Sequence, residues 1–262
     1  MTTTTDHWVD HPCGRMFARQ WQPEDAEPAL APIVLLHDSL GCVELWRDFP
    51  ALLAAATRRR VIAYDRLGFG RSDARVGRPA AGFIAEEATA VWPALRAQLR
   101  IARFVAVGHS VGGGMAVEIA AHAGGDCTAL VTMAAQAFVE DRTLAGLRVA
   151  QAQFADPAQV ERLARYHGGK AAWALDAWLG RWLDPAFAAW SLAAALPRVT
   201  CPVLVIHGDQ DEYGSAAHPR RIAEGVAGPA RLEMLPRGGH IPYREQPALV
   251  VRLIADFLAQ IT

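Results

Sequence analysis

The chain has 262 residues, of which 52% are hydrophobic, and its formal net charge is −1. This length fits one large domain, or one domain with an insertion, and the apolar content is sufficient for a sizeable core. Charges of both signs are spread along the chain, which leaves no basic footprint for nucleic acid or an anionic membrane, and no apolar run is long enough to span a bilayer.

Strand and helix patterns alternate along the chain. Residues 8–21 are predicted to form two short strands around a turn at residues 12–14. Short apolar runs typical of buried strands follow, separated by segments with helical spacing. The further predicted strands are 32–38, 60–65, 103–108, 128–133, 202–208 and 230–235, and the predicted helices are 43–56, 81–99, 110–122, 216–226 and 246–260. This order predicts an α/β fold with a mostly parallel eight-stranded sheet flanked by helices.

Residues 134–200 interrupt this alternation, because every segment between them has apolar residues at helical spacing. Breaks between helices are expected near Asp156, Gly168 and Pro185. Such a block is predicted to lie over the carboxyl ends of the strands, where open α/β sheets bind ligands. We call residues 134–200 the insert and expect residues 1–133 and 201–262 to form the core domain beneath this helical cap.

The sequence Gly108-His109-Ser110-Val111-Gly112 has the form G-x-S-x-G at a predicted junction between a strand and a helix. In such an elbow the serine occupies a sharp, strained turn, and the glycines two residues before and after it avoid steric clashes. The turn also presents the N–H of Val111 beside a helix N-terminus, which favours negative charge. Ser110 is therefore the candidate nucleophile.

A nucleophilic serine needs a base, and the base needs an orienting acid. His240 lies in a glycine-bounded loop between the last predicted strand and the last predicted helix. Asp209 and Asp211 both follow the predicted strand 202–208, and either fits the role of the acid. All the candidates come directly after sheet strands, in the chain order serine, aspartate, histidine.

Five motifs in this order resemble those of cap-bearing α/β-hydrolases. They are LLHDSLG at 35–41, DRLGFGRS at 65–72, GHSVGG at 108–113, HGDQD at 207–211 and GGH at 238–240. The resemblance covers nearly the whole chain and implies a serine hydrolase with Ser110 as nucleophile, His240 as general base and acid, and Asp211 as orienting acid. It favours Asp211 over Asp209 because the family's G-x-x-D spacing runs from Gly208 to Asp211.

The resemblance also implies an oxyanion hole made by the backbone N–H groups of Val111 and Ser39, with Leu40 as the less favoured alternative to Ser39. The chain departs from the family pattern at Asp38, where a glycine usually follows the loop histidine. A carboxylate there would repel the developing oxyanion. We therefore expect the Asp38 side chain to point away and to hold its own loop by a local hydrogen bond.

The activity that this resemblance implies is hydrolysis of a small, largely apolar carboxylic ester or lactone through an acyl-enzyme, without a metal or an organic cofactor. Two alternatives stay open. One is a ligand receptor of the same fold with little turnover. The other is a hydrolase of carbon–carbon bonds, although those enzymes commonly have asparagine where this chain has His109.

Four tryptophans crowd the insert, and most of them are expected to form its own small core. They are Trp173, Trp178, Trp182 and Trp190. Trp182 and Trp190 are our candidates for side chains that face an apolar substrate. We expect a small-molecule partner only, with no nucleic acid or membrane partner, and a monomer or homodimer.

The cysteines and the N-terminal segment indicate in which cellular compartment the protein is expected. The four cysteines are far apart and form no CxxC pair, so neither a zinc site nor a disulfide framework is indicated. The first ten residues lack the basic and apolar stretches of a signal peptide. We therefore expect a cytoplasmic protein.

Overall fold

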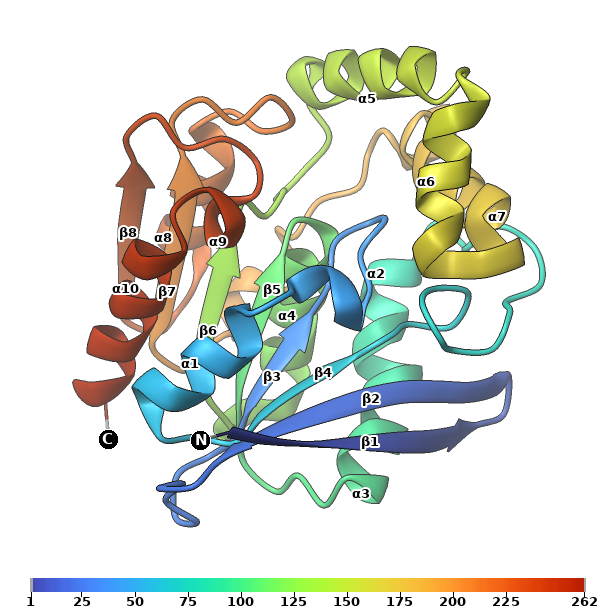
Figure 1. The fold of residues 1–262 in the computed structure, drawn as a ribbon. Helices are drawn as coiled ribbons and strands as arrows, with labels where there is room; N and C mark the ends of the chain where they lie inside the picture. Colours follow the sequence, from blue (N-terminus) through green and yellow to red (C-terminus); the bar gives the residue numbers. More distant parts are fainter. Residues whose placement is uncertain (1, 262) are drawn as a thin grey trace.

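The computed structural model describes residues 2–261 and contains one eight-stranded sheet with helices on both faces (Figure 1). The strands are β1 (Thr2–His11), β2 (Gly14–Pro23), β3 (Ile33–Leu36), β4 (Val61–Tyr64), β5 (Phe104–His109), β6 (Cys127–Met133), β7 (Val203–Gly208) and β8 (Ala230–Leu235). Their order in the sheet is β1-β2-β4-β3-β5-β6-β7-β8. The β1–β2 hairpin and the β2–β4 pair are antiparallel, and all other neighbours are parallel. The predicted fold class is confirmed.

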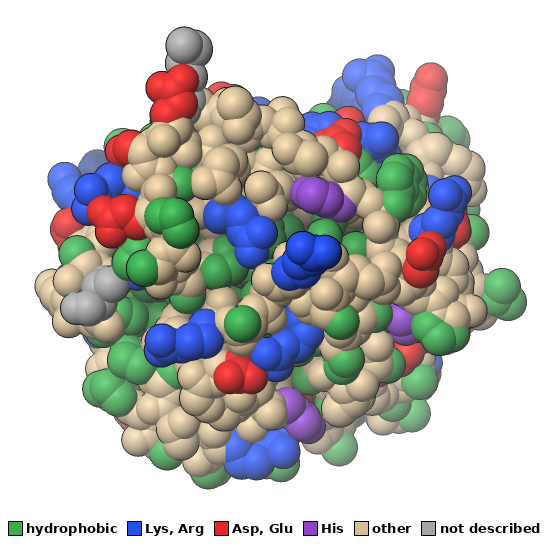
Figure 2. All heavy atoms as spheres, turned by 90° about the horizontal axis from the view of Figure 1, so that it is seen from below, with side chains coloured by type: hydrophobic (Ala, Val, Ile, Leu, Met, Phe, Trp, Pro, Cys, Tyr) green, Lys and Arg blue, Asp and Glu red, His purple; other side chains and the backbone are tan. Residues whose placement is uncertain are grey.

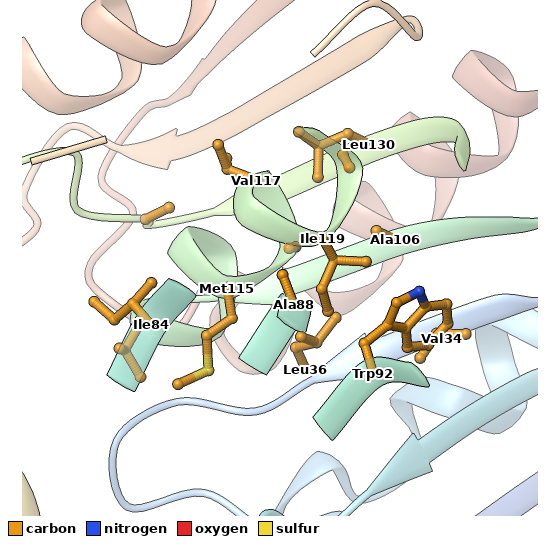
Figure 3. Packing of buried hydrophobic residues seen from close by; sticks show 14 of the residues in the cluster. Val34, Leu36, Ile84, Ala88, Trp92, Ala106, Met115, Val117, Ile119 and Leu130 are labelled. Atoms are coloured by element: carbon orange, nitrogen blue, oxygen red, sulfur yellow. The ribbon is translucent and has the colours of Figure 1, made fainter. Parts of the chain in front are cut away.

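Two hydrophobic clusters cover the two faces of the sheet, because successive side chains of a strand point to opposite sides. In β3, Val34 and Leu36 belong to one cluster and Ile33 and Leu35 to the other. The first cluster packs against α2 (Phe83–Glu86), α3 (Trp92–Gln98), α4 (Val111–Ala123) and α8 (Ala217–Gly225), and Figure 3 shows part of it. The second packs against α1 (Phe49–Thr57), α9 (Pro242–Glu245) and α10 (Pro247–Ala259).

The insert leaves the sheet after β6 and returns at β7. Its helices α5 (Asp141–Gln153), α6 (Pro157–His167) and α7 (Ala171–Leu175) lie above the end of the sheet toward which the parallel arrows point (Figure 1). A π turn at Asp176–Gly180 continues α7. The prediction of a last helix in the insert, beginning at Pro185, is wrong, because only short 3-10 turns form there. Leu192 N–H instead donates to Ala137 O, so this stretch bonds to the start of the insert.

Two other predicted helices are each divided. The segment 43–56 contains a 3-10 turn at Val43–Trp46 and then α1, because Arg47 adopts a left-handed φ of 53° between them. Within the segment 81–99 the chain is helical from Phe83 to Gln98, but a π turn at Glu87–Val91 separates α2 from α3 just before Pro93, which has no N–H to donate. At the N-terminus the first strand begins at Thr2, earlier than predicted, because the hairpin pairs along its whole length.

Figure 2 shows the molecule from below, on the face at the amino ends of the parallel strands, where several arginine side chains gather. One hollow of about 520 Å³ is lined by Arg59, Arg60, Arg100 and Arg103, among others. It lies at the opposite edge of the sheet from the insert and so is separate from the site described next. Within residues 2–261, no helix is both long and apolar enough to cross a bilayer.

Candidate active site

Ser110 occupies a strained turn between β5 and α4. Its φ is 54° and its ψ is −124°, a conformation that side chains with a β-carbon rarely adopt. A β-carbon on Gly108 would lie 2.1 Å from the carbonyl oxygen of Gly112, and one on Gly112 would lie 2.2 Å from the carbonyl oxygen of Leu36. Both glycines are therefore required by close backbone contacts, and the turn that they permit holds Ser110 at the carboxyl edge of the sheet.

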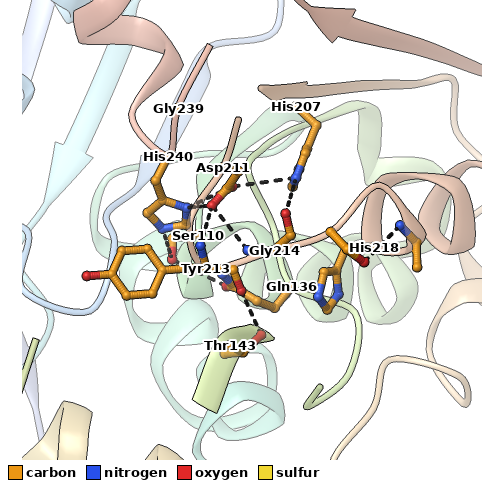
Figure 4. A network of polar contacts seen from close by, with 12 residues as sticks. Ser110, Gln136, Thr143, His207, Asp211, Tyr213, Gly214, His218, Gly239 and His240 are labelled. Atoms are coloured by element: carbon orange, nitrogen blue, oxygen red, sulfur yellow. Dashed lines mark hydrogen bonds and ion pairs between the residues drawn. The ribbon is translucent and has the colours of Figure 1, made fainter. Parts of the chain in front are cut away.

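The structure brings together the three side chains that the sequence singled out (Figure 4). Ser110 Oγ lies 3.0 Å from His240 Nε2. On the other side of the ring, His240 Nδ1 lies 3.0 Å from Asp211 Oδ1 and 2.9 Å from Oδ2. Asp211 is fully buried, whereas Asp209 is exposed. The geometry therefore places Asp211, and not Asp209, behind the imidazole.

The loop after β7 holds the Asp211 carboxylate in place. The backbone N–H groups of Tyr213 and Gly214 donate to Asp211 Oδ1 at 2.8 and 3.1 Å. His207 Nε2 donates to Gly214 O at 3.1 Å and lies 3.5 Å from Asp211 Oδ2. Burial is the main reason why the pKa of His207 lies below its usual value, so this ring is a neutral support.

The pKa values of the two partners shift in opposite directions. Burial alone would raise the pKa of Asp211, but the hydrogen bond and charge of His240 outweigh it, so the pKa is lowered. Burial alone would lower the pKa of His240, but the hydrogen bond and charge of Asp211 outweigh it, so the pKa is raised. Asp211 therefore stays ionised, and a neutral His240 keeps its proton on Nδ1, leaving Nε2 free to accept the proton of Ser110.

The loop that follows β3, residues 37–41, carries the predicted oxyanion donor Ser39 and is called the oxyanion loop below; the side chain of Asp38 holds it. Its Oδ1 accepts the N–H of Leu40 at 2.9 Å, and its Oδ2 lies 3.2 Å from His109 Nδ1. The local hydrogen bond expected for Asp38 is therefore present, and its carboxylate has a second partner in the nucleophile elbow. The N–H of Leu40 is occupied, whereas within residues 2–261 the N–H groups of Ser39 and Val111 have no protein acceptor.

Two adjoining cavities lie beneath the insert. The smaller one, about 160 Å³, is lined by Ser110 and His240 together with residues of the oxyanion loop and of α5. The larger one has a volume of about 420 Å³. Ser39, Trp178 and Trp182 line both cavities and so form the wall between them.

The tryptophans of the insert differ in position. Trp173 lines the larger cavity. Trp190 lines neither cavity and stacks on Phe187 with ring centroids 5.5 Å apart, so its place is in the core of the insert, in contrast to the expectation that it faces the site. Trp182 lines both cavities, and its contact with substrate stays a prediction.

Gln136 is a site residue that the sequence reasoning missed. Its side-chain oxygen lies 3.3 Å from Ser110 Oγ, and it lines the smaller cavity. It lies in the loop after the carboxyl end of β6, as Asp211 lies in the loop after β7, and Ser110 directly follows β5. No motif marks Gln136, and its position after the carboxyl end of a strand is the one feature of the sequence that indicates a site residue.

Comparisons with known proteins agree with this fold. A sequence model described as the alpha/beta hydrolase family matches residues 33–253. The chain is 28% identical to a 2-hydroxymuconate semialdehyde hydrolase of Pseudomonas sp. (strain CF600), over 87% of this chain and 87% of that protein. A solved structure of a hydrolase from Pseudomonas aeruginosa PA01 is 25% identical, with a TM-score of 0.72 over 97% of this chain and 98% of its own. The enol-lactonase from Burkholderia xenovorans LB400 is 24% identical, with a TM-score of 0.72 over 97% and 100%.

Proposed function

The chain belongs to the alpha/beta hydrolase family, and from this premise we propose that it hydrolyses a small, largely apolar carboxylic ester or lactone through Ser110, His240 and Asp211. The observation that carries the proposal is the continuous line of contacts from Ser110 Oγ to His240 Nε2 and from His240 Nδ1 to Asp211. A cytoplasmic location, a monomer or homodimer, and a small molecule as the sole partner remain predictions.

The proposed reaction has two halves. Ser110 Oγ attacks the carbonyl carbon while His240 Nε2 takes the hydroxyl proton, and the carbonyl oxygen becomes an oxyanion facing the N–H groups of Ser39 and Val111. The intermediate collapses, the ester C–O bond breaks, and His240 returns the proton to the leaving alkoxide. Water then attacks the acyl-enzyme, gives a proton to His240 and releases the acid, and the proton restores Ser110. In a lactone the alkoxide stays attached to the acyl group.

A carbon–carbon bond hydrolase is the second candidate, favoured by the 28% identity to 2-hydroxymuconate semialdehyde hydrolase. In this structure His109, the residue before the nucleophile, lies 2.7 Å from the carbonyl oxygen of His240 and close to the carboxylate of Asp38. Through these contacts His109 connects the turn at Ser110 with the loop of Asp38 and the loop of His240. His109, at the position where carbon–carbon bond hydrolases commonly have asparagine, therefore has a supporting place in this site.

A substrate panel with site labelling tests the proposal. The panel contains short-chain, long-chain and aryl esters, lactones and 2-hydroxymuconate semialdehyde, and the readouts are turnover and the serine modified by a fluorophosphonate. We expect multiple turnovers of esters or lactones and label on Ser110 alone, both absent from Ser110→Ala. Turnover of the semialdehyde alone would favour the second candidate. Binding without turnover would favour the receptor alternative, and a label on another serine would contradict the assignment of Ser110.

The activity should fall on acidification at a higher pH than for an ordinary histidine. His240 must be neutral to accept the proton, and its pKa is raised because Asp211 outweighs the effect of burial. Protonation therefore removes the base as the pH falls through a value above about 6.5, the usual histidine pKa. The measurement is kcat/KM against pH on a neutral ester. An acid limb well below that value in folded protein would contradict the role of His240.

The wall between the cavities should set acyl-chain preference. We propose that the insert acts as a cap, in which Trp182 separates the small cavity at Ser110 from the larger one. Trp182→Ala should join them and raise kcat/KM for long acyl chains relative to short ones by about tenfold or more, since each methylene accommodated is worth about 1–3 kcal/mol.

Trp190→Ala is the matched control for this experiment, because Trp190 packs in the insert without lining either cavity. It should lower the melting temperature and leave the order of chain lengths unchanged. Trp182→Leu is measured as well, in case the alanine variant does not fold. An unchanged order in a folded Trp182 variant would end the idea that this side chain determines specificity.

A further inference from the structure

A buried arginine, Arg66, contacts the oxyanion loop and also lines the larger cavity. Arg66 is 7% exposed, and its Nη2 donates to the backbone oxygen of Asp38 at 2.7 Å. Its Nε lies 3.3 Å from His37 Nε2, and the ring of Phe69 covers the guanidinium at 4.4 Å. Within residues 2–261, no carboxylate oxygen lies within 4.0 Å of its nitrogens. The buried carboxylate of Glu87 attracts the guanidinium only from a longer distance, so the groups that directly satisfy the N–H groups of Arg66 are Asp38 O and His37.

The carbonyl group that Arg66 holds belongs to the peptide bond that also carries the Ser39 N–H. His37 Nδ1 lies 2.7 Å from the same oxygen, and the N–H of Gly41 donates to it at 3.3 Å. A trans peptide is planar, and its C=O and N–H groups point in opposite directions. Fixing the oxygen of Asp38 toward Arg66 and His37 therefore fixes the N–H on the opposite side. Ser39 and Ser110 line the same small cavity, in which the oxygen of the attacked carbonyl group would become the oxyanion.

We propose that Arg66 is a positioning residue of the oxyanion hole: it fixes the Asp38–Ser39 peptide, and its charge makes the Ser39 N–H a stronger donor. The inference rests on the proposed function and adds to it a residue outside the triad. A cation bound to the carbonyl oxygen polarises the peptide, in the manner of a hydrogen-bond chain. The N–H then carries more positive charge where the substrate oxygen becomes negative.

This role predicts a specific kinetic signature. The substrate oxygen carries its full negative charge only near the transition state, so a weakened N–H donor lowers kcat and leaves KM nearly unchanged. Loss of a whole oxyanion donor costs about 10²–10³ in kcat. Loss of its positioning residue should cost less, and we expect a decrease of about 10- to 100-fold on a neutral ester such as p-nitrophenyl acetate.

The experiment compares Arg66→Met, Arg66→Lys and Arg66→Ala with the wild type. Besides kcat and KM, it measures the affinity for a trifluoromethyl ketone and for the matching methyl ketone. Ser110 adds to the carbonyl carbon of the trifluoromethyl ketone, its proton passes to His240, and the carbonyl oxygen becomes an oxyanion. In Arg66→Met the trifluoromethyl ketone should bind more weakly by the same factor as kcat falls, and the methyl ketone should bind unchanged. Free guanidinium at non-denaturing concentration should partly restore kcat in Arg66→Ala.

Arg59→Met is the matched control, because Arg59 is also buried and donates to a backbone carbonyl, that of Ala31, at the other edge of the sheet. It should lower thermal stability and leave kcat and ketone affinities unchanged. A kcat of Arg66→Met equal to the wild type on the neutral ester, or a loss confined to the KM of anionic esters, would overturn the inference while leaving the proposed function intact. A wild type without Ser110-dependent turnover would contradict the proposed function, and the inference with it.

Discussion

Replacing Asp211 with asparagine is expected to lower kcat by about 10⁴-fold, because an amide in that place stabilises the wrong tautomer of His240, the proposed general base. In the structure both oxygens of Asp211 lie within 3.0 Å of His240 Nδ1. An asparagine would present its NH₂ group to the ring from one of these positions, so His240 Nδ1 would have to accept and Nε2 would carry the proton. A protonated Nε2 cannot take the proton of Ser110.

Asp209→Asn provides the matched control. Asp209 follows the same strand two residues earlier but is exposed, so its kcat should change little. Both variants are measured at the optimal pH and across a pH series, after circular dichroism has shown that they are folded. In Asp211→Asn the residual activity should decline at a lower pH than in the wild type, because the charge that raises the pKa of His240 is absent. If Asp209→Asn proves the more damaging of the two, the acid has been assigned to the wrong carboxylate.

Replacing Gly112 with alanine is expected to destabilise the fold by more than about 4 kcal/mol, the range reached only when backbone or core packing is directly violated. The added β-carbon would lie 2.2 Å from Leu36 O and 2.5 Å from His37 O, and both are backbone atoms of the central strand region that cannot swing aside. Any relief would separate α4 from β3 and displace Ser110 from the oxyanion loop, so fluorophosphonate labelling should be lost even in molecules that remain folded.

Gly125→Ala is the control for this substitution, since a β-carbon there would have no atom within 4 Å. Chemical denaturation should show a change within about 0.5 kcal/mol, as for ordinary surface sites. Labelling of Ser110 should be unaffected in this variant. A Gly112→Ala protein with wild-type stability and normal labelling would show that the elbow tolerates the contact, and that the glycine is not required there.

The order of the elements and the elbow could be predicted from the sequence because both depend on local physics. Buried parallel strands appear as short apolar runs, and a strained turn requires glycines at fixed offsets, so β3 to β8 and the turn at Ser110 are visible in the residues themselves. The same local reasoning was wrong for the end of the insert. There Leu192, Ala195 and Leu196 are buried without forming an α-helix, and the backbone N–H of Leu192 donates to Ala137 O.

The tertiary structure decided which side chains meet. The residues themselves left Asp209 and Asp211 as equal candidates, and only the resemblance in G-x-x-D spacing favoured Asp211. The path of the loop after β7 is what buries Asp211 against His240. Asp38 finds its partner His109 71 residues away in the chain. Arg66 reaches the Asp38–Ser39 peptide because β3 and β4 are neighbours in the sheet. Local sterics are specified by a few adjacent residues, whereas burial and pairing of polar groups depend on segments that only the folded sheet brings together.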